Sequence, residues 1–215
     1  IHGHDAFLIE FEQLEKILSP IFTQPKTRSL KKKGIKVLKF GGRSLANGEG
    51  LERVVDIIAE KANDNDKFVV VLSARGVSTD LLEGILEKAK SGASYKEDFD
   101  AFKKYQLVPD ATLDFKHEFD LLDQIFEGVA LLGDYSEKIK DRVLAQGEVL
   151  SVKLLSALLN KKGIPSKAVD SRKLIKTDSN FGEALVLEEV SKENVKKYFA
   201  NNGHHLQLVT GFIAS

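Results

Sequence analysis

The segment Lys39-Phe40-Gly41-Gly42 joins a cation to two adjacent glycines, a combination suited to binding an anion. Glycines allow backbone N–H groups to approach an anion closely, and the lysine adds a point charge. Because a polar stretch and a helix follow, the positive end of the helix dipole could contribute as well. The spacing fits neither G-x-x-x-x-G-K-[ST] nor G-x-G-x-x-G. The residues alone leave two interpretations open: a cradle for the phosphates of ATP, or a tight strand-to-helix turn with an exposed lysine.

A second candidate is the segment 73–80, which follows an apolar run at 67–73 that is typical of a strand buried on both faces. Ligands of open α/β sheets bind beyond the carboxyl ends of the strands. Small hydroxyl residues such as Ser73 and Thr79 could therefore hold a substrate carboxylate. The alternative is that a hydroxyl or acidic residue at 78–80 caps the next helix.

The third candidate is Glu148, which lies in a long helix predicted for residues 136–162. At about 100° per residue, it falls near the edge of the apolar face of that helix. A carboxylate that faces the core is costly unless it is paired or binds a cation. An ammonium-bearing substrate would be one partner, and a salt bridge to a neighbouring Lys or Arg is the alternative. Gly147 costs a helix about 1 kcal/mol relative to alanine, which indicates a packing role.

The other polar clusters favour no chemistry. His2-Gly3-His4-Asp5 could suggest a metal site or a triad, but an isolated pair at a chain end is more often inert. His204 and His205 are expected in a solvated turn, and the charged stretch at 94–120 on a solvated helical face. The sequence contains no Ser-His-Asp set with supporting context and no convincing metal-ligand spacing.

Strands and helices that alternate after Gly34 would position these candidates. Hydrophobic period and residue type predict strands at 35–40, 67–73, 166–169, 184–188 and 206–211, and helices at 50–62, 79–91, 96–106, 112–132, 136–162 and 191–200. Such alternation predicts an α/β fold with a mainly parallel sheet sandwiched by helices. Gly163 is the expected C-terminal cap of the long helix. Residues 5–22 are predicted to form a separate helix, followed by a polar, basic tether.

The composition narrows the class of protein. Lys plus Arg equals Asp plus Glu at 32 each, which argues against a nucleic-acid partner. No apolar run approaches the roughly 18 residues that span a bilayer, so no membrane partner is expected, and the expected compartment is the cytoplasm. The lack of Cys excludes disulfides and thiolate metal sites. Because the chain starts at Ile1 and has no Met, we expect it to be a piece of a longer product.

Residues 36–44 resemble the opening strand of aspartate kinases, whose hallmark is Lys-Phe-Gly-Gly followed by Thr or Ser and then Ser. Further similar segments follow in the same order: Val70-Val71-Leu72-Ser73-Ala74 with Thr79, Gly147-Glu148-x-x-Ser151, Thr177-Asp178 with Phe181-Gly182-x-Ala184, and Val209-Thr210-Gly211-Phe212. Each match is modest, but their order and spacing over residues 36–215 make the resemblance specific.

The resemblance implies an amino-acid-kinase fold, incomplete at its C-terminus. It also implies transfer of the γ-phosphate of ATP to the side-chain carboxylate of L-aspartate, which gives 4-phospho-L-aspartate. That reaction is the first step in the synthesis of lysine, threonine and methionine. Mg²⁺ is expected with ATP, since phosphoryl transfer depends on positioning and charge neutralisation. The full-length parent is expected to be a homo-oligomer.

The same resemblance assigns roles to two groups of residues. Those expected to bind ATP are Lys39, Phe40, Gly41 and Gly42. Those expected to bind aspartate are Ser73, Thr79 and Glu148. Lys39 would be catalytic, because it would neutralise the transferring phosphates, and Glu148 would face the ammonium group of the substrate. An acceptor that is already an ionised carboxylate requires no dedicated catalytic base.

Two features depart from the family pattern. Arg43 stands where many relatives have Thr, which removes a hydroxyl group from that position. The chain also ends before the Gly-Arg-Gly-Gly-Ser-Asp segment of the family, which helps to bind aspartate and phosphates. We therefore expect the chain alone to be inactive or nearly so. Two alternatives stay open: another amino-acid kinase, acting on glutamate or carbamate, and a non-catalytic module of the same fold.

The segment Gly3-His4-Asp5-Ala6-Phe7-Leu8 resembles the C-terminal end of homoserine O-acetyltransferases, in which the histidine that matches His4 is the base of a triad. This implies a multifunctional parent that fuses an acetyltransferase to an aspartate kinase. The expected division is a C-terminal helix of a preceding domain at 1–24, a linker at 25–34, and the N-terminal part of the kinase catalytic domain at 35–215.

Overall fold

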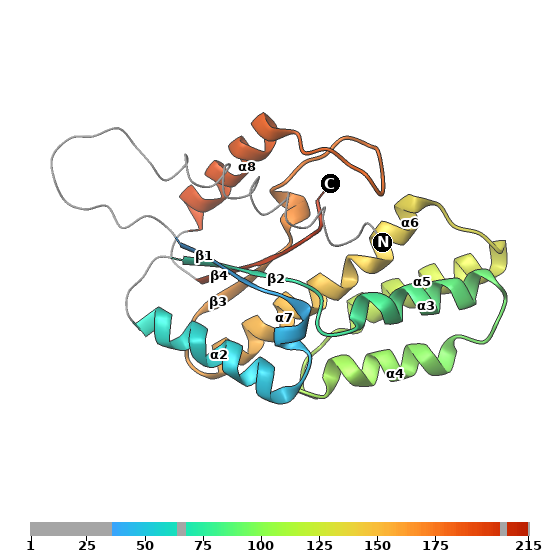
Figure 1. Cartoon of the computed structure of the whole chain (residues 1–215), viewed down its shortest axis with the longest axis horizontal. Helices are drawn as coiled ribbons and strands as arrows, with labels where there is room; N and C mark the ends of the chain where they lie inside the picture. The colour runs from blue at the N-terminus through green and yellow to red at the C-terminus, as the bar shows by residue number, and fades with distance from the viewer. Residues whose placement is uncertain (1–35, 64–67, 203–205, 215) are drawn as a thin grey trace, which may run out of the picture.

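The computed structural model describes residues 36–63, 68–202 and 206–214, which form an α/β fold (Figure 1). The strands are β1 (Lys36–Phe40), β2 (Phe68–Leu72), β3 (Ser166–Val169) and β4 (Leu206–Thr210). The α-helices are α2 (Gly48–Asn63), α3 (Ser78–Lys90), α4 (Lys96–Leu107), α5 (Lys116–Leu132), α6 (Glu137–Leu144), α7 (Gln146–Lys161) and α8 (Glu188–Asn201). Two short 3-10 helices are η1 (Gly42–Leu45) and η2 (Ser171–Lys173). The helix predicted at 5–22, the tether and the His pairs lie outside the described residues.

The four strands form one parallel sheet in the order β1-β2-β4-β3. All five residues of β2 are buried, as expected for the central apolar run at 67–73. Parallel strands need crossover connections, and helices supply them in this chain. The parallel sheet predicted from the alternation of elements is therefore confirmed.

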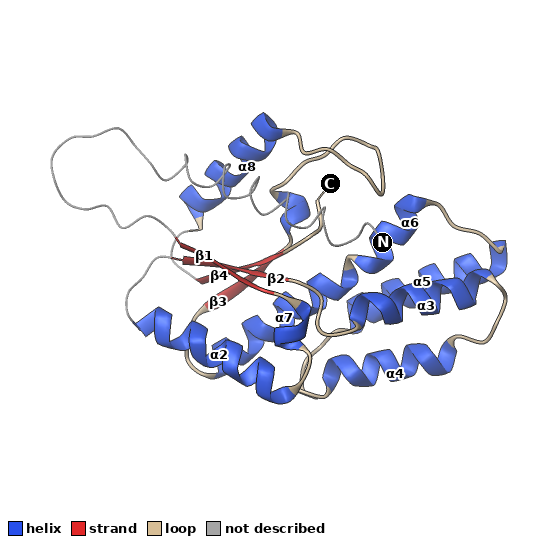
Figure 2. Ribbon diagram, viewed as in Figure 1, coloured by secondary structure: helices blue, strands red, loops and turns tan. Residues whose placement is uncertain are grey.

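Alternate side chains of the strands face two different layers of helices. Leu38, Val70 and Leu208 belong to a large core with α2 and α7. Val69 and Val209, each one position away from Val70 and Leu208, belong to a smaller core with α8. Figure 2 shows the strands between these helices. The sheet is thus covered on both faces, which accounts for the nearly continuous apolar sequence of β2.

Helices α3, α4, α5 and α6 form a helical excursion beside the sheet, between β2 and α7 (Figure 1). Its core is aromatic: Phe99, Phe102 and Phe126 are each no more than 1% exposed. The rings of Phe99 and Phe126 meet edge to face, with their centroids 5.3 Å apart. This geometry is the preferred one for aromatic pairs. The aromatic residues of the excursion belong to the same hydrophobic cluster as the main core.

The helix predicted at 136–162 is interrupted. A turn at Ala145 divides it into α6 and α7. The expected end is confirmed, because Gly163 adopts a positive φ of 78° and its N–H donates to the carbonyl of Asn160. By length and composition, Glu137–Lys161 could cross a membrane, but 72% of its most apolar window is buried inside the protein. Its apolar residues therefore belong to the core of the fold.

Two other predicted elements differ from the structure. The strand expected at 184–188 is wrong: Val186 makes only an isolated antiparallel bridge to Thr177. The side chain of Asp178 accepts hydrogen bonds from the N–H groups of Asn180 and Leu185, which folds this segment back on itself. The helix expected from residue 112 begins later. An Asp or Asn side chain that bonds to the backbone two residues on is typical of a turn before a helix, and Asp114 makes such a bond to the N–H of Lys116.

Candidate active site

The carboxyl ends of β1, β2 and β4 lie along one edge of the sheet, because these parallel strands are neighbours. Three backbone hydrogen bonds join the turns beyond them: Ser73 N–H to Phe40 O (3.2 Å), Gly76 N–H to Gly42 O (2.9 Å) and Gly211 N–H to Leu72 O (2.8 Å). We call this region the strand edge. It is where ligands bind in open α/β sheets.

Two glycines at the strand edge are required by close approach to Ala74. A Cβ atom at Gly42 would lie 2.6 Å from the carbonyl oxygen of Ala74. A Cβ atom at Gly147, in the first turn of α7, would lie 2.8 Å from Ala74 Cβ. Both distances are shorter than real Cβ contacts, so a larger residue would push the turns apart. The packing role predicted for Gly147 is confirmed. Ala74 is held between Gly42, in the loop after β1, and Gly147, in α7.

Glu148 lies beside Gly147 and is only 5% exposed. The N–H of Ala74 donates to its Oε1 at 3.1 Å. Burial raises the pKa of Glu148 to about 7, and the bond from Ala74 only partly opposes this shift. In the described part of the chain no Lys or Arg acts on this carboxylate. The expected burial is confirmed, and the alternative of an internal salt bridge is not found among those residues.

The two hydroxyl residues predicted to bind aspartate lie on the loop after β2 and in the first turn of α3. Ser73 follows the strand directly, and its Oγ is buried without a hydrogen-bond partner in the residues that the structure describes. Thr79 is partly exposed in the first turn of α3. The N-cap of α3 is Val77, and Ser78 Oγ donates backwards to the carbonyl of Arg75 at 2.5 Å. The Ser73 hydroxyl is therefore a candidate contact for a ligand.

Lys39 is the next-to-last residue of β1 and stands opposite Val71 in the sheet. Val37 packs on the α8 side, so Lys39, two positions further, points to that same side. Beyond it, the first N–H groups of η1 have no acceptor within that short helix. An ammonium group beside backbone donors and glycines fits a polyphosphate such as ATP.

No group of three or more His, Asp or Glu side chains is placed to hold a metal ion within the ranges that the structure describes.

Two residues that were not singled out in the sequence also lie at this edge. Arg75, on the loop after β2, stacks over the ring of Tyr105, with its Cζ 3.8 Å from the ring centroid. Tyr105 belongs to the last turn of α4, in the stretch interpreted as a solvated helical face. That interpretation is incomplete, because Phe99, Phe102 and Gln106 of the same helix are buried. The apolar spacing of the two phenylalanines was the signal in the sequence that α4 has a buried side.

The same stretch contains a buried acid. Glu118, in the first turn of α5, is buried and forms an ion pair with Lys153 on α7. An unpaired carboxylate would be costly at this depth, so the pair explains how the residue is tolerated. The solvated face predicted for 94–120 is therefore wrong at Glu118.

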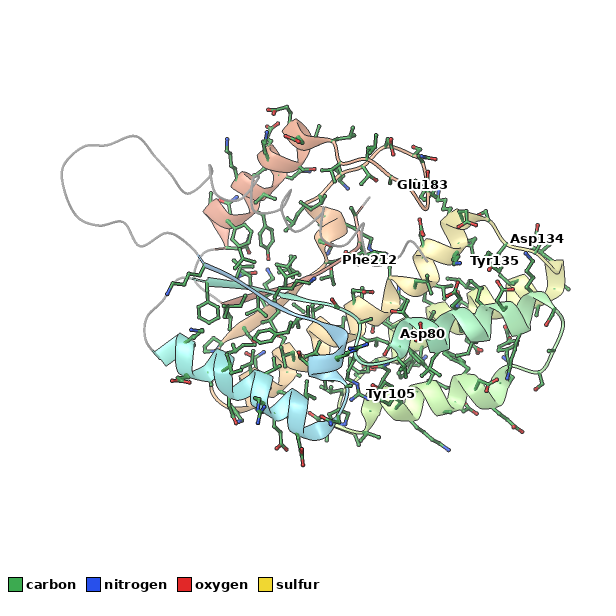
Figure 3. All side chains as sticks on the ribbon, viewed as in Figure 1. Asp80, Tyr105, Asp134, Tyr135, Glu183 and Phe212 are labelled. Atoms are coloured by element: carbon green, nitrogen blue, oxygen red, sulfur yellow. The ribbon has the colours of Figure 1, made fainter. Side chains whose placement is uncertain are left out.

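The ends of β3 and β4 are joined by a hydroxyl pair. The N–H of Ser171 donates to Thr210 Oγ1 at 2.8 Å, and the two hydroxyl oxygens lie 2.7 Å apart. Phe212 follows with a φ of 64° and is half exposed near the strand edge (Figure 3). A positive φ is unusual for a residue with a Cβ atom and marks a turn held by its surroundings. This turn corresponds to the predicted segment Val209-Thr210-Gly211-Phe212.

Residues 177–186, which include the segment that resembles aspartate kinases, form a loop that leans on α6, with Phe181 and Gly182 near its tip. The N–H of Gly182 donates to Asp141 Oδ2 at 3.2 Å, and Lys138 Nζ lies 5.5 Å from the centroid of the Phe181 ring. Figure 3 shows Glu183 in this loop, on the α6 side of the molecule. The structure thus places this segment against α6, which leads directly into α7.

The sequence comparisons agree on one family. The model of the amino acid kinase family matches residues 34–215. The chain is 29% identical over 192 residues to the bifunctional aspartokinase/homoserine dehydrogenase of Daucus carota, which covers 82% of this chain and 20% of the relative. It is 28% identical over 217 residues to the chloroplastic aspartokinase 1 of Arabidopsis thaliana. That match covers 92% of this chain and 37% of the relative. The chain therefore spans well under half the length of these relatives.

Solved structures agree with the sequence matches. The fold is similar to that of Escherichia coli aspartokinase III in complex with aspartate and ADP, with a TM-score of 0.71 and 28% sequence identity. That match covers 84% of this chain and 41% of the other. The same enzyme in complex with lysine and aspartate matches with a TM-score of 0.67 and 25% identity.

Proposed function

The chain belongs to the amino acid kinase family, and from this premise we propose that it serves as part of an aspartokinase. The proposed reaction transfers the γ-phosphate of ATP to the side-chain carboxylate of L-aspartate. The relatives named as aspartokinases, and the similar structure that holds aspartate and ADP, support this choice of substrates.

The observation that carries the proposal is the environment of Glu148. Its carboxylate is buried at the strand edge and accepts a hydrogen bond from Ala74 N–H, while no cation acts on it among the described residues. A buried carboxylate needs a positive partner to be stable in its ionised form. An α-ammonium group is such a partner, and Ser73 Oγ stands on the loop that bonds to Glu148. An amino-acid substrate therefore suits this place better than a sugar or a nucleobase.

The residues proposed to bind the phosphates lie at the end of β1 and in the loop that follows it. Lys39 would neutralise the transferring phosphate, and the backbone of Gly41 and Gly42 would allow its close approach. When bound with ATP, Mg²⁺ supplies the divalent charge that phosphoryl transfer needs. An aspartate carboxylate is already ionised at neutral pH, so the residues at the strand edge have only to position it.

Other features of the parent protein stay predictions. These are the division at 1–24, 25–34 and 35–215, the cytoplasmic location, and assembly into a homo-oligomer. The same holds for the acetyltransferase-like segment, because residues 1–24 lie outside the described ranges.

The proposal is tested by measuring acyl-phosphate formation, trapped with hydroxylamine, for the full-length product of the gene that encodes this chain. Aspartate, glutamate and carbamate are offered separately with ATP and Mg²⁺. We expect product from aspartate alone. Glu148→Gln should raise the KM for aspartate about 100-fold, because a charge partner of the substrate ammonium is lost.

Glu118→Gln is the matched control, since Glu118 is also buried but is paired with Lys153. It should leave the KM for aspartate within about twofold of the wild type. Turnover of glutamate or carbamate in place of aspartate would favour another amino-acid kinase. Absence of both turnover and calorimetric binding of aspartate would favour a non-catalytic module.

A further inference from the structure

Two loops at the strand edge carry some of the residues proposed to bind ATP and aspartate, Gly41 and Gly42 on one and Ser73 on the other, and one side chain contacts both loops. The first loop follows β1 and includes Ala46, and the second follows β2 and includes Arg75. The hydroxyl group of Tyr105 donates to the carbonyl of Ala46 at 3.2 Å. The ring of the same tyrosine lies under the guanidinium of Arg75, and Arg75 Nη2 donates to the carbonyl of Tyr105. Tyr105 belongs to α4 and to neither loop, so it bridges them from outside.

The close fit around Tyr105 depends on Gly76. A Cβ atom at Gly76 would lie 2.3 Å from the Tyr105 hydroxyl and 3.3 Å from Ala46. Gly76 also has a positive φ of 55°, which glycine adopts without strain. Its N–H donates to the carbonyl of Gly42 at 2.9 Å. Gly76 therefore takes part both in the contact between the two loops and in the packing around the Tyr105 hydroxyl.

The buried cation Arg75 contacts Tyr105 rather than a carboxylate. This residue is 3% exposed, and no carboxylate lies within salt-bridge distance of it in the described part of the chain. Its Nε has no hydrogen-bond partner among the described residues, and burial lowers its pKa. A buried cation without a carboxylate costs more than an apolar residue of the same size would. Such a cost is tolerated where a group has a role in positioning.

We propose that Tyr105 is a positioning residue that fixes the spacing between the two loops, acting through Ala46 and Arg75. This inference rests on the proposed function, because it assigns phosphate binding to the first loop and aspartate binding to the second. Phosphoryl transfer depends mainly on positioning, and a displacement of about 1 Å can cost roughly 100-fold in rate. Tyr105 would affect the rate without touching either substrate.

The test compares Tyr105→Phe, Tyr105→Leu and Tyr135→Phe in the full-length gene product. Tyr105→Phe removes the hydroxyl bonds to the carbonyls of Ala46 (3.2 Å) and Arg75 (3.5 Å) and keeps the ring under Arg75. Tyr105→Leu removes both contacts. Tyr135→Phe is the matched control, because Tyr135 bonds to Glu87 and lies at the far end of the helical excursion from Tyr105 (Figure 3).

We expect Tyr105→Phe to lower kcat about tenfold with the KM for aspartate within about twofold, because one loop moves relative to the other. Tyr105→Leu should lower kcat about 100-fold and raise that KM about tenfold. Hydrogen exchange should be faster at 42–47 in the first variant and at both 42–47 and 73–78 in the second. Tyr135→Phe should change none of these quantities.

Two results would overturn the inference. One is a Tyr105→Phe protein whose kcat and exchange at 42–47 match those of Tyr135→Phe. The other is a loss of thermal stability in Tyr105→Leu with unchanged kinetics below the melting temperature, since that indicates a structural role only. If the wild type phosphorylates no aspartate, the proposed function fails, and exchange at the two loops still decides whether Tyr105 joins them.

Discussion

The strand edge and the helical excursion differ in how they treat buried polar groups. In the excursion, Phe99, Phe102 and Phe126 pack ring against ring. At the strand edge, Glu148 and Arg75 are buried without an opposite charge among the described residues. Three described side chains hold a buried polar atom without a partner: Ser73 and Arg75 on the loop after β2, and Glu118 in the excursion, whose other carboxylate oxygen pairs with Lys153. One region is built for packing, and the other has polar groups that a ligand could satisfy.

The difference indicates that the excursion contributes mainly to the stability of the fold and that the strand edge contributes mainly to ligand binding. Apolar burial contributes to stability in proportion to the area removed from water. Buried polar groups without partners lower stability and persist at functional sites. Substitutions in the two regions should therefore change different quantities.

The largest effect on stability is expected from Phe99→Ala in the excursion. Removing a fully buried ring loses its transfer free energy and leaves a cavity, which together cost about 3–5 kcal/mol. Urea unfolding of the described chain measures this loss. Phe181→Ala is the control, because that ring is 42% exposed, and it should cost less than about 1 kcal/mol. A decrease in the free energy of unfolding of less than about 1 kcal/mol for Phe99→Ala would show that the aromatic cluster contributes little to the stability of the excursion.

The next effect has the opposite sign and lies at the strand edge. The folded pKa of Glu148 is raised from 4.5 to about 7, so the folded state holds the proton more tightly than the unfolded state. The stability that protonation contributes is complete below pH 4.5 and is lost as the pH rises through 7. Glu148→Gln has no carboxyl group to ionise, so its stability does not fall as the pH rises through 7. At pH 8 it should therefore be more stable than the wild type by up to about 3 kcal/mol.

Unfolding measured from pH 5 to pH 8 checks the sign of that change. The difference between wild type and Glu148→Gln should shrink as the pH falls toward 5. In the full-length enzyme, affinity for aspartate should rise as the pH passes through 7, because ionised Glu148 is the form that binds an ammonium group. A stability difference that is independent of pH would contradict the assignment of the shift to this carboxylate.

A third comparison uses Gly41 and Gly42, two adjacent glycines in the loop after β1. Gly42→Ala places a Cβ 2.6 Å from the Ala74 carbonyl, whereas a Cβ at Gly41 meets nothing within 4 Å. Overpacking of this kind costs about 1–3 kcal/mol. Gly42→Ala should therefore lower both thermal stability and kcat, and Gly41→Ala should leave the melting temperature nearly unchanged. Equal melting temperatures for the two variants would mean that the turns are not packed as closely as the structure has them.

The smallest effect is expected on the surface of the excursion. Lys96 Nζ lies 3.0 Å from both Asp123 and Glu127, and these bonds raise its pKa, but its side chain is 55% exposed. Exposed ion pairs contribute little because water and salt screen them. Lys96→Met should therefore change stability by less than about 0.5 kcal/mol. The measurement is urea unfolding at low and high salt, and a loss above about 1 kcal/mol at high salt would contradict the expected screening.

Much of the fold could be predicted from the sequence because its elements have strong local signals. The five apolar residues of β2 and the glycine at the end of α7 are of this kind. The division of α6 from α7 at Ala145 was not predictable, since the apolar period continues through it. The strand expected at 184–188 failed because a single side chain, Asp178, folds that segment into a turn.

The candidate site was partly predictable as well. A glycine pair after a strand and a carboxylate on an apolar helix face are visible in the sequence, and both lie at the strand edge. Arg75 lies in the candidate segment 73–80, but no role was predicted for it, and Tyr105 was not found, because the contact between the two is not visible in the sequence. Their roles arise from stacking between a loop and a helix that lie 30 residues apart.

The sequence by itself determined most of the strands and helices, the glycine turns and the types of side chain that could meet phosphates and an ammonium group. These properties depend on neighbours within a few positions, where hydrophobic period and backbone preference act. Only the tertiary structure decided that Ala74 lies between Gly42 and Gly147, and that Glu148 bonds to a loop 74 residues away. Contacts of that range depend on how the layers pack together, which no local pattern contains.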